Sequence, residues 1–215
     1  MEKCERNSNK RFTVLGVEFV YLYLVGMIFA FIGWCAENTA KLVIGGTIDS
    51  RFHILPFIAI YVSISFAFHI ALGSPNNIVF FGKRIFKSET PKTKILSNVI
   101  SFVGISLAVF LGELVVGNMW DILFGVKLWN YSKLPLHLTQ YTSIVSTLGF
   151  GAGAYLIFKF IYNPLLNLFR NKLSYKVAKW IVLTLGVLIA ADGLRMILCI
   201  IFMGEAPMCW RIKLW

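Results

Sequence analysis

The stretch VLGVEFVYLYLVGMIFAFIGWCA, residues 14–36, decides the class of this chain, because Glu18 is the single charged residue in it. A helix of about 20 apolar residues spans the hydrocarbon core of a bilayer. Four further runs reach this length: residues 54–73, 95–117, 142–163 and 180–203. The sequence therefore predicts an all-α integral membrane protein, a bundle of five transmembrane helices forming a single membrane domain over residues 1–215.

The composition agrees with this class, since 58% of residues are hydrophobic and 14% are charged, against about 25% charged in soluble domains. A net charge of +11 could suggest nucleic acid as a partner. The basic residues, however, fall in short blocks between the apolar runs and not in one patch. We therefore expect the lipid bilayer as the partner and no nucleic acid.

The blocks of Lys and Arg predict the orientation. The N-terminus and the second and fourth loops together hold 13 basic residues, whereas the other loops and the C-terminus hold 6. Basic loops stay in the cytoplasm. We expect a multi-pass protein of the cell membrane, with its N-terminus cytoplasmic and its C-terminus external. Between the third and fourth helices, Asn118–Tyr141 is rich in aromatic residues with few charges, which predicts an external segment at the membrane interface.

Three ionisable residues lie deep within predicted spans, where an unpaired charge costs several kcal/mol. Asp192 and Arg195 are three residues apart on one helix, a spacing that allows direct pairing. Arg195 could also reach Glu113 across a helix interface. We interpret these residues as a buried charge cluster, serving either as a structural ion pair that fixes helix register or as a polar pathway for a substrate or ion.

Glu37 follows a face of small residues, Gly26, Ala30 and Gly33, at the external end of the first helix. Small residues let helices approach closely in lipid. Glu37 is thus expected to point into the bundle or its external mouth, with solvation at the interface as the alternative.

The fourth predicted helix carries Gly149 and Gly153, a G-x-x-x-G step, with Gly151 between them. Tight packing against a neighbouring helix is the favoured interpretation. A flexible helix that lines a cavity is the alternative.

The sequence has no G-x-x-x-x-G-K-[ST] loop for nucleotide phosphates and no G-x-S-x-G elbow. His53, His69 and His137 are isolated, without the spacing of metal ligands. We expect no catalytic residue, metal or cofactor, and no enzyme activity.

Two regions resemble the bacterial family described as "Putative ABC-transporter type IV", also called CmpB-like. The first is FIGWCAE, Phe31–Glu37, followed by DSRFHILPF, Asp49–Phe57. The second is ELVVGN, Glu113–Asn118, followed by FGVKLWNYSKLP, Phe124–Pro135. The chain departs from the family pattern at Asn130, where an acid is usual. The matching motif positions are Gly33, Trp34, Pro56, Trp129, Asn130, Tyr131, Ser132 and Pro135.

The resemblance, over roughly Val25–Phe169, implies a multi-pass membrane protein of permease type. It supplies no substrate and no catalytic residue. An ATP-binding subunit would then be a separate polypeptide. Three functions stay open: a permease-like component of an ABC-type transport system, a membrane scaffold or accessory protein for another membrane protein, and an enzyme acting on lipid or envelope precursors. In the enzyme, Glu37 and Glu113 would be acid and base, aided by Arg51.

Overall fold

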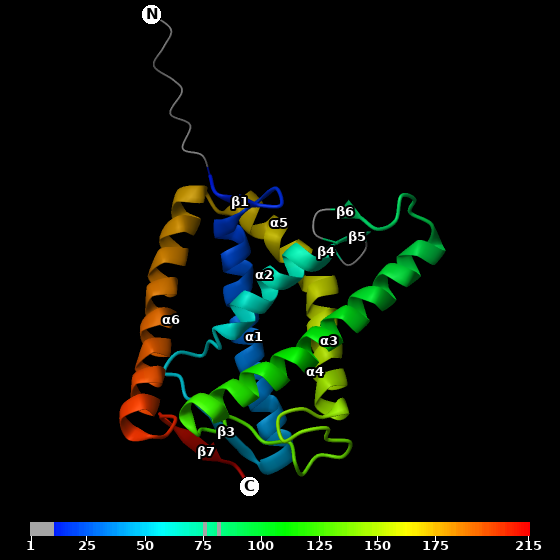
Figure 1. The fold of residues 1–215 in the computed structure, drawn as a ribbon. Helices are drawn as coiled ribbons and strands as arrows, with labels where there is room; N and C mark the ends of the chain where they lie inside the picture. Colours follow the sequence, from blue (N-terminus) through cyan, green and yellow to red (C-terminus); the bar gives the residue numbers. More distant parts are fainter. Residues whose placement is uncertain (1–10, 75–76, 81–82) are drawn as a thin grey trace, which may run out of the picture.

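The computed structural model describes residues 11–74, 77–80 and 83–215 (Figure 1). The basic residues Lys3, Arg6 and Lys10 lie outside this part of the chain. Within the described part, which is mostly helical, four helices are long and apolar enough to cross a membrane. They are α1 (Phe19–Gly45), α3 (Pro91–Phe124), the continuous helix of α4 (Ile144–Ile157), η1 (Phe158–Tyr162) and α5 (Asn163–Lys172), and α6 (Tyr175–Met203).

The second predicted span differs, because its helix α2 (Ile60–Leu72) has only 13 residues, or about 20 Å. The chain nevertheless passes from one end of the bundle back to the other through residues 50–72, first as an irregular segment and then as α2 (Figure 1). Pro56 disfavours helix formation because it lacks an N–H and restricts the residue before it. At the other end Gly73, with a φ of +63°, terminates the helix.

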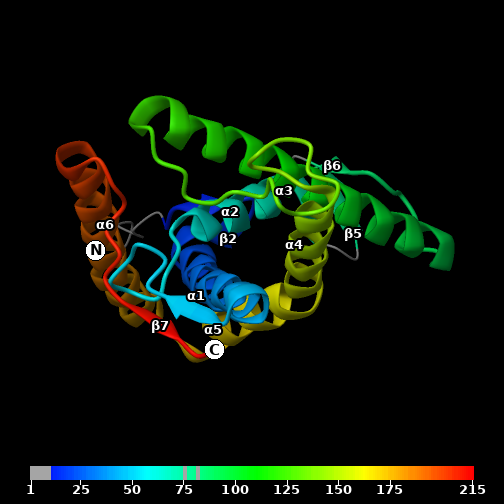
Figure 2. The same cartoon turned by 90° about the horizontal axis from the view of Figure 1, so that it is seen from below.

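Helix α1 is the most buried of the long helices and lies at the centre, with the other helices arranged around it (Figure 2). Its predicted small face packs against α2. A Cβ atom on Gly26 would lie 2.8 Å from Ser65 Oγ, and one on Gly33 would overlap the Tyr61 ring. The small residues of α1 therefore let it approach α2 closely, as predicted.

Helix α3 has 34 residues, about 51 Å, and crosses the bundle obliquely (Figure 1). A helix longer than the bilayer is thick can be accommodated by tilting. Thr90 and Thr93 form a capping box at its start, and Gly125, with a φ of +65°, ends it. The predicted interfacial segment 118–141 therefore begins as the last turns of α3 and continues as an irregular loop. Its location at a membrane interface stays a prediction.

The fourth span is longer than predicted, because the π-helical turn η1 joins α4 to α5 without a break. The chain bends there, and α5 packs against α1 (Figures 1 and 2). Gly151 of α4 contacts α3, since a Cβ there would overlap Ser106 Oγ. Gly149 and Gly153 would meet nothing within 4 Å. The close helix contact is therefore made by Gly151 and not by the G-x-x-x-G step.

Short strands connect the helices, which a purely helical prediction does not include. Strands β1 (Thr13–Val14) and β2 (Val17–Glu18) pair before α1. Near the C-terminus, β7 (Arg211–Lys213) pairs with β3 (Thr47–Asp49), which follows α1. The last group pairs in the order β4 (Gly73–Ser74), β5 (Asn77–Phe80) and β6 (Lys83–Arg84). The described chain starts at the end that holds α5 and finishes at the opposite end (Figure 1).

Candidate functional site

Glu37 points into the bundle, where two side chains bind its carboxylate. Arg51 Nε lies 2.6 Å from Glu37 Oε2, and the Tyr61 hydroxyl donates to Glu37 Oε1 at 3.0 Å. The Arg51 and Glu37 side chains are 12% and 19% exposed, so this ion pair is mostly shielded from solvent. The residues come from three elements, since Glu37 is on α1, Arg51 on the irregular segment and Tyr61 on α2.

Glu113, on α3, lies near enough to Glu37 for the two carboxyl groups to interact electrostatically. Ser146 of α4 donates to Glu113 Oε2 at 3.1 Å, and the Tyr131 hydroxyl forms a further hydrogen bond. Burial raises the pKa of Tyr131, so its hydroxyl stays protonated and donates. We refer to these residues as the Glu37 cluster: Glu37, Arg51, Tyr61, Glu113, Tyr131 and Ser146.

The charges of the Glu37 cluster are unbalanced. Arg51 forms an ion pair with Glu37. Among the described residues, no Lys, Arg or His forms an ion pair with Glu113, whose partners are two neutral hydroxyl groups. A buried carboxyl group without a cationic partner is a candidate for binding a cation, a proton or a hydrogen-bond donor of a ligand.

Asp192 and Arg195 form the predicted ion pair, with Arg195 Nε 3.1 Å from Asp192 Oδ1. The pair also binds backbone. The N–H groups of Ile54 and Leu55 donate to Asp192 Oδ2 at 2.9 and 3.0 Å, and Arg195 donates to the carbonyl oxygen of Phe52 at 2.8 Å. Non-helical backbone inside a membrane must find partners within the protein. Asp192 and Arg195 supply these partners to the irregular segment.

The hypothesised contact between Arg195 and Glu113 is not formed in the described residues. Arg195 is held by Asp192 and Phe52, whereas Glu113 binds Ser146 and Tyr131. Two separate groups exist because the irregular segment contributes backbone groups to α6. We refer to His53, Asp192 and Arg195 as the Asp192 cluster. His53 Nδ1 lies 3.6 Å from Asp192 Oδ2 and also senses the charges of the Glu37 cluster.

Asp49 positions Arg51 from the end of α1. Its backbone N–H donates to Asn38 Oδ1 at 2.8 Å, its Oδ1 accepts from the Arg51 N–H at 3.0 Å, and Lys41 pairs with Oδ2. Burial alone would raise the pKa of Asp49, but the hydrogen bonds and charges of Lys41 and Arg51 outweigh it and hold the pKa below its ordinary value. Asp49 is therefore a fixed anion that shapes the segment carrying Arg51.

The backbone next to Asp49 is strained. Arg51 and Phe52 have φ values of 52° and 70°, in the left-handed region that L-residues other than glycine rarely adopt. Such residues cost of order 1–3 kcal/mol each and persist where their surroundings hold them. Here Asp49 binds the Arg51 N–H, and Arg195 binds the Phe52 carbonyl. The strained pair directs Arg51 toward the Glu37 cluster.

The first group of motif residues supports this arrangement. Gly33 allows the Tyr61 ring to lie against α1, and Trp34 donates its indole N–H to the Ser50 carbonyl at 3.4 Å. Pro56 lies in the irregular segment just before α2. These residues position the segment that carries Arg51.

The second group of motif residues shapes the loop after α3. Trp129 donates to the Tyr141 carbonyl at 3.0 Å, and Pro135 accepts from Ser143 Oγ at 3.3 Å. Asn130 Oδ1 accepts from the Ser132 N–H at 2.8 Å. An Asp at this position could accept the same bond, so the departure at Asn130 preserves the turn. The turn places Tyr131 against Glu113.

The sequence alone did not identify several residues of the site. Tyr61 and Ser146 lie in apolar runs and carry no motif that marks them, while His53 was set aside as isolated. Tyr131 had a signal, as part of the second motif, but no role. The residues join the site through contacts between distant segments, which no local spacing reveals.

These features define a class: a helical membrane protein with a broken second crossing and a polar cluster formed where its helices and loops converge. A profile of the family described as "Putative ABC-transporter type IV" matches residues 24–197. The chain belongs to this family. No curated protein and no solved structure matches the chain.

Proposed function

We propose that this chain is the permease-like membrane component of an ABC-type transport system, with its ATP-binding subunit on a separate polypeptide. The observation that carries the proposal is Glu113, a mostly buried carboxyl group without a cationic partner among the described residues, beside the Glu37–Arg51 pair. Ionisable groups within membrane helices often mark substrate or ion pathways. The transported compound is left open.

The broken second crossing supports the same function. In transporters, discontinuous helices place backbone groups and charges at the substrate site within the membrane. Here the irregular segment before α2 carries Arg51 into the Glu37 cluster and presents backbone to the Asp192 cluster. A movement of this segment would change both clusters together.

The proposed orientation puts the basic end of the bundle in the cytoplasm, with the N-terminus there and the C-terminus external. The Glu37 cluster, near the other end of α1, then faces the external side. The loops at the basic end are where an ATP-binding subunit would dock.

The proposal is tested by purifying the tagged full-length chain from its native membranes in mild detergent. We expect an ATP-binding subunit to co-purify, with ATPase activity in reconstituted vesicles. Glu113→Gln should lower this activity at least about tenfold while the subunit stays bound, because it removes a site charge. Glu205→Gln changes an exposed carboxyl group outside the cluster and serves as the control. Equal activity of both variants, or absence of any ATP-binding subunit after cross-linking, would overturn the proposal.

A membrane enzyme is the second candidate, and the proximity of Glu37 and Glu113 favours it. Two carboxyl groups with different partners can act as acid and base. The purified chain would be incubated with lipid-linked envelope precursors, and products measured by mass spectrometry. Turnover that is lost in Glu37→Gln and Glu113→Gln without an ATP-binding subunit would select this function.

A further inference from the structure

A cleft with a volume of about 330 Å³ opens at the basic end of the bundle, away from both clusters. It lies between the start of α1 and the helix α5. Its lining consists of Arg11, Glu18, Tyr21, Asn167, Arg170 and Asn171. All six side chains are polar, so the cleft suits a polar ligand and not an acyl chain.

Helix α5 supplies half of this lining because it is amphipathic. Asn167, Arg170 and Asn171 have the i, i+3 and i+4 spacing of one helix face. On its other side, Leu166 is buried and Phe169 packs against the core. The apolar contacts fix α5 against α1, so its polar face is held at the cleft.

The charges of the cleft favour an anion. Arg11 and Arg170 lie on either side of Glu18, with their nitrogen atoms 3.7 and 3.4 Å from its carboxylate oxygens. Each guanidinium has five N–H donors, more than one carboxylate can occupy. The two side chains are 56% and 42% exposed, so their remaining donors are reachable. Two cations against one anion leave a net positive charge.

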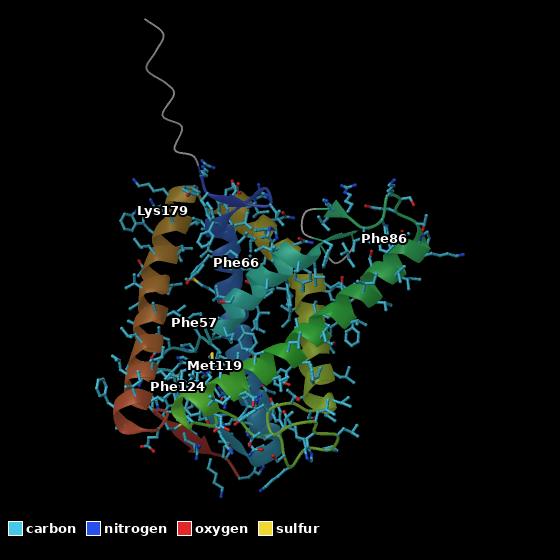
Figure 3. All side chains as sticks on the ribbon, viewed as in Figure 1. Phe57, Phe66, Phe86, Met119, Phe124 and Lys179 are labelled. Atoms are coloured by element: carbon cyan, nitrogen blue, oxygen red, sulfur yellow. The ribbon has the colours of Figure 1, made fainter. Side chains whose placement is uncertain are left out.

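Two amide side chains add neutral donors, and Tyr21 borders the cleft while its hydroxyl donates to the Leu173 carbonyl at 3.0 Å. Guanidinium groups bind phosphate oxygens with paired hydrogen bonds. The surroundings are also basic, since exposed Lys172, Lys176 and Lys179 lie at this end of the bundle, where Figure 3 labels Lys179.

We infer that this cleft binds a phosphate-bearing anion, either the headgroup of an anionic lipid or a soluble phosphate ester, through Arg11 and Arg170. Glu18 occupies part of the arginine donors in the free protein and competes with the ligand. The inference does not depend on transport, because the cleft is separate from the Glu37 cluster.

The test measures binding to the purified full-length chain in phosphate-free buffer. Binding of phosphatidylglycerol, with phosphatidylcholine as the reference, is followed by lipid retention in native mass spectrometry and by thermal stability in nanodiscs. A second arm adds glycerol phosphate to the protein in detergent. A response to both ligands identifies headgroup chemistry alone, whereas a response to phosphatidylglycerol only identifies a membrane lipid; either result supports the site.

Arg11→Gln and Arg170→Gln should each weaken binding about fivefold, the factor that corresponds to one basic residue near an anionic surface. Lys179→Gln removes the same charge at the same end but outside the cleft, and should have a clearly smaller effect. Glu18→Gln should strengthen binding, an effect in the opposite direction to general destabilisation. If Arg170→Gln folds poorly, Arg170→Lys is used and should bind between wild type and Gln.

Equal losses in Arg170→Gln and Lys179→Gln would show that the end of the bundle attracts anions without a specific site, which overturns the inference. Weaker binding in Glu18→Gln, or no preference for phosphatidylglycerol and no effect of glycerol phosphate, would overturn it as well. Loss of the ATP-binding subunit would bear on the proposed transport function alone.

Discussion

The Glu37–Arg51 pair and the Asp192–Arg195 pair have the same chemistry but different surroundings. Asp192 and Arg195 bind backbone groups of the irregular segment, Ile54, Leu55 and Phe52. Glu37 instead binds side chains, close to a second carboxyl group on Glu113. A pair that serves backbone is needed for the fold, whereas a side-chain cluster with an uncompensated carboxyl group is available to a ligand.

This comparison resolves part of the choice left by the sequence. The structural interpretation of Asp192 and Arg195 gains a specific form, since they stabilise a broken crossing and not simply a helix register. The pathway interpretation moves to Glu37 and Glu113, where charge and hydroxyl groups from four elements converge.

The largest effect is expected for Asp192→Leu. The substitution leaves the Arg195 charge without its partner and two backbone N–H groups without an acceptor. Removing one member of a buried ion pair costs about 3–5 kcal/mol. Membrane yield and the thermal unfolding temperature in detergent would both fall. Conversely, if Arg195→Leu folded and inserted normally but abolished transport, the structural role assigned to this pair would be wrong.

Asp49→Asn should have the next largest effect, because it removes the charge that binds Lys41 and orders Arg51. Hydrogen bonds to charged groups contribute about 1.5–3 kcal/mol. The pKa of Asp49 is lowered in the folded protein, so its contribution is complete above the unfolded pKa of about 3.9 and is lost as pH falls through the folded-state pKa. Thermal unfolding between pH 7 and pH 3 should therefore be more acid-sensitive in wild type than in the variant, and equal sensitivity would contradict the assignment.

Gly33→Ala tests the geometry of the Glu37 cluster. Its Cβ would overlap the Tyr61 ring and move the hydroxyl that binds Glu37. Overpacking costs about 1–3 kcal/mol. Gly149→Ala is the matched control, because a Cβ there meets nothing within 4 Å. Unfolding temperatures of the two variants should differ clearly, and similar values would argue against close packing at Gly33.

The smallest effect is expected for Asn130→Asp. Because Asp can accept the Ser132 N–H in the same turn, stability should change by less than about 0.5 kcal/mol. The thermal unfolding temperature measures this directly. A large loss would show that the Asn130 amide donates to a partner that an acid repels.

Particular elements show how far the sequence could be interpreted. The lengths of the runs at 95–117 and 180–203 predicted α3 and α6, and the spacing of Asp192 and Arg195 predicted their pair. Residues 54–73 misled the prediction of a full helix, because residues 54–59 are apolar yet irregular. An average over hydrophobicity does not detect that Asp192, from a distant helix, binds their backbone N–H groups.

By itself the sequence determined that this is a membrane protein of helices, because long apolar runs must satisfy their own backbone hydrogen bonds in lipid. It also determined the family motifs and which helices carry charge. Only the tertiary structure decided which charges meet, since Arg51 joins Glu37 and Glu113 through strained backbone and helix contacts. The physical reason is that hydrophobicity and helical periodicity are local, whereas the pairing of buried charges depends on segments brought together by packing.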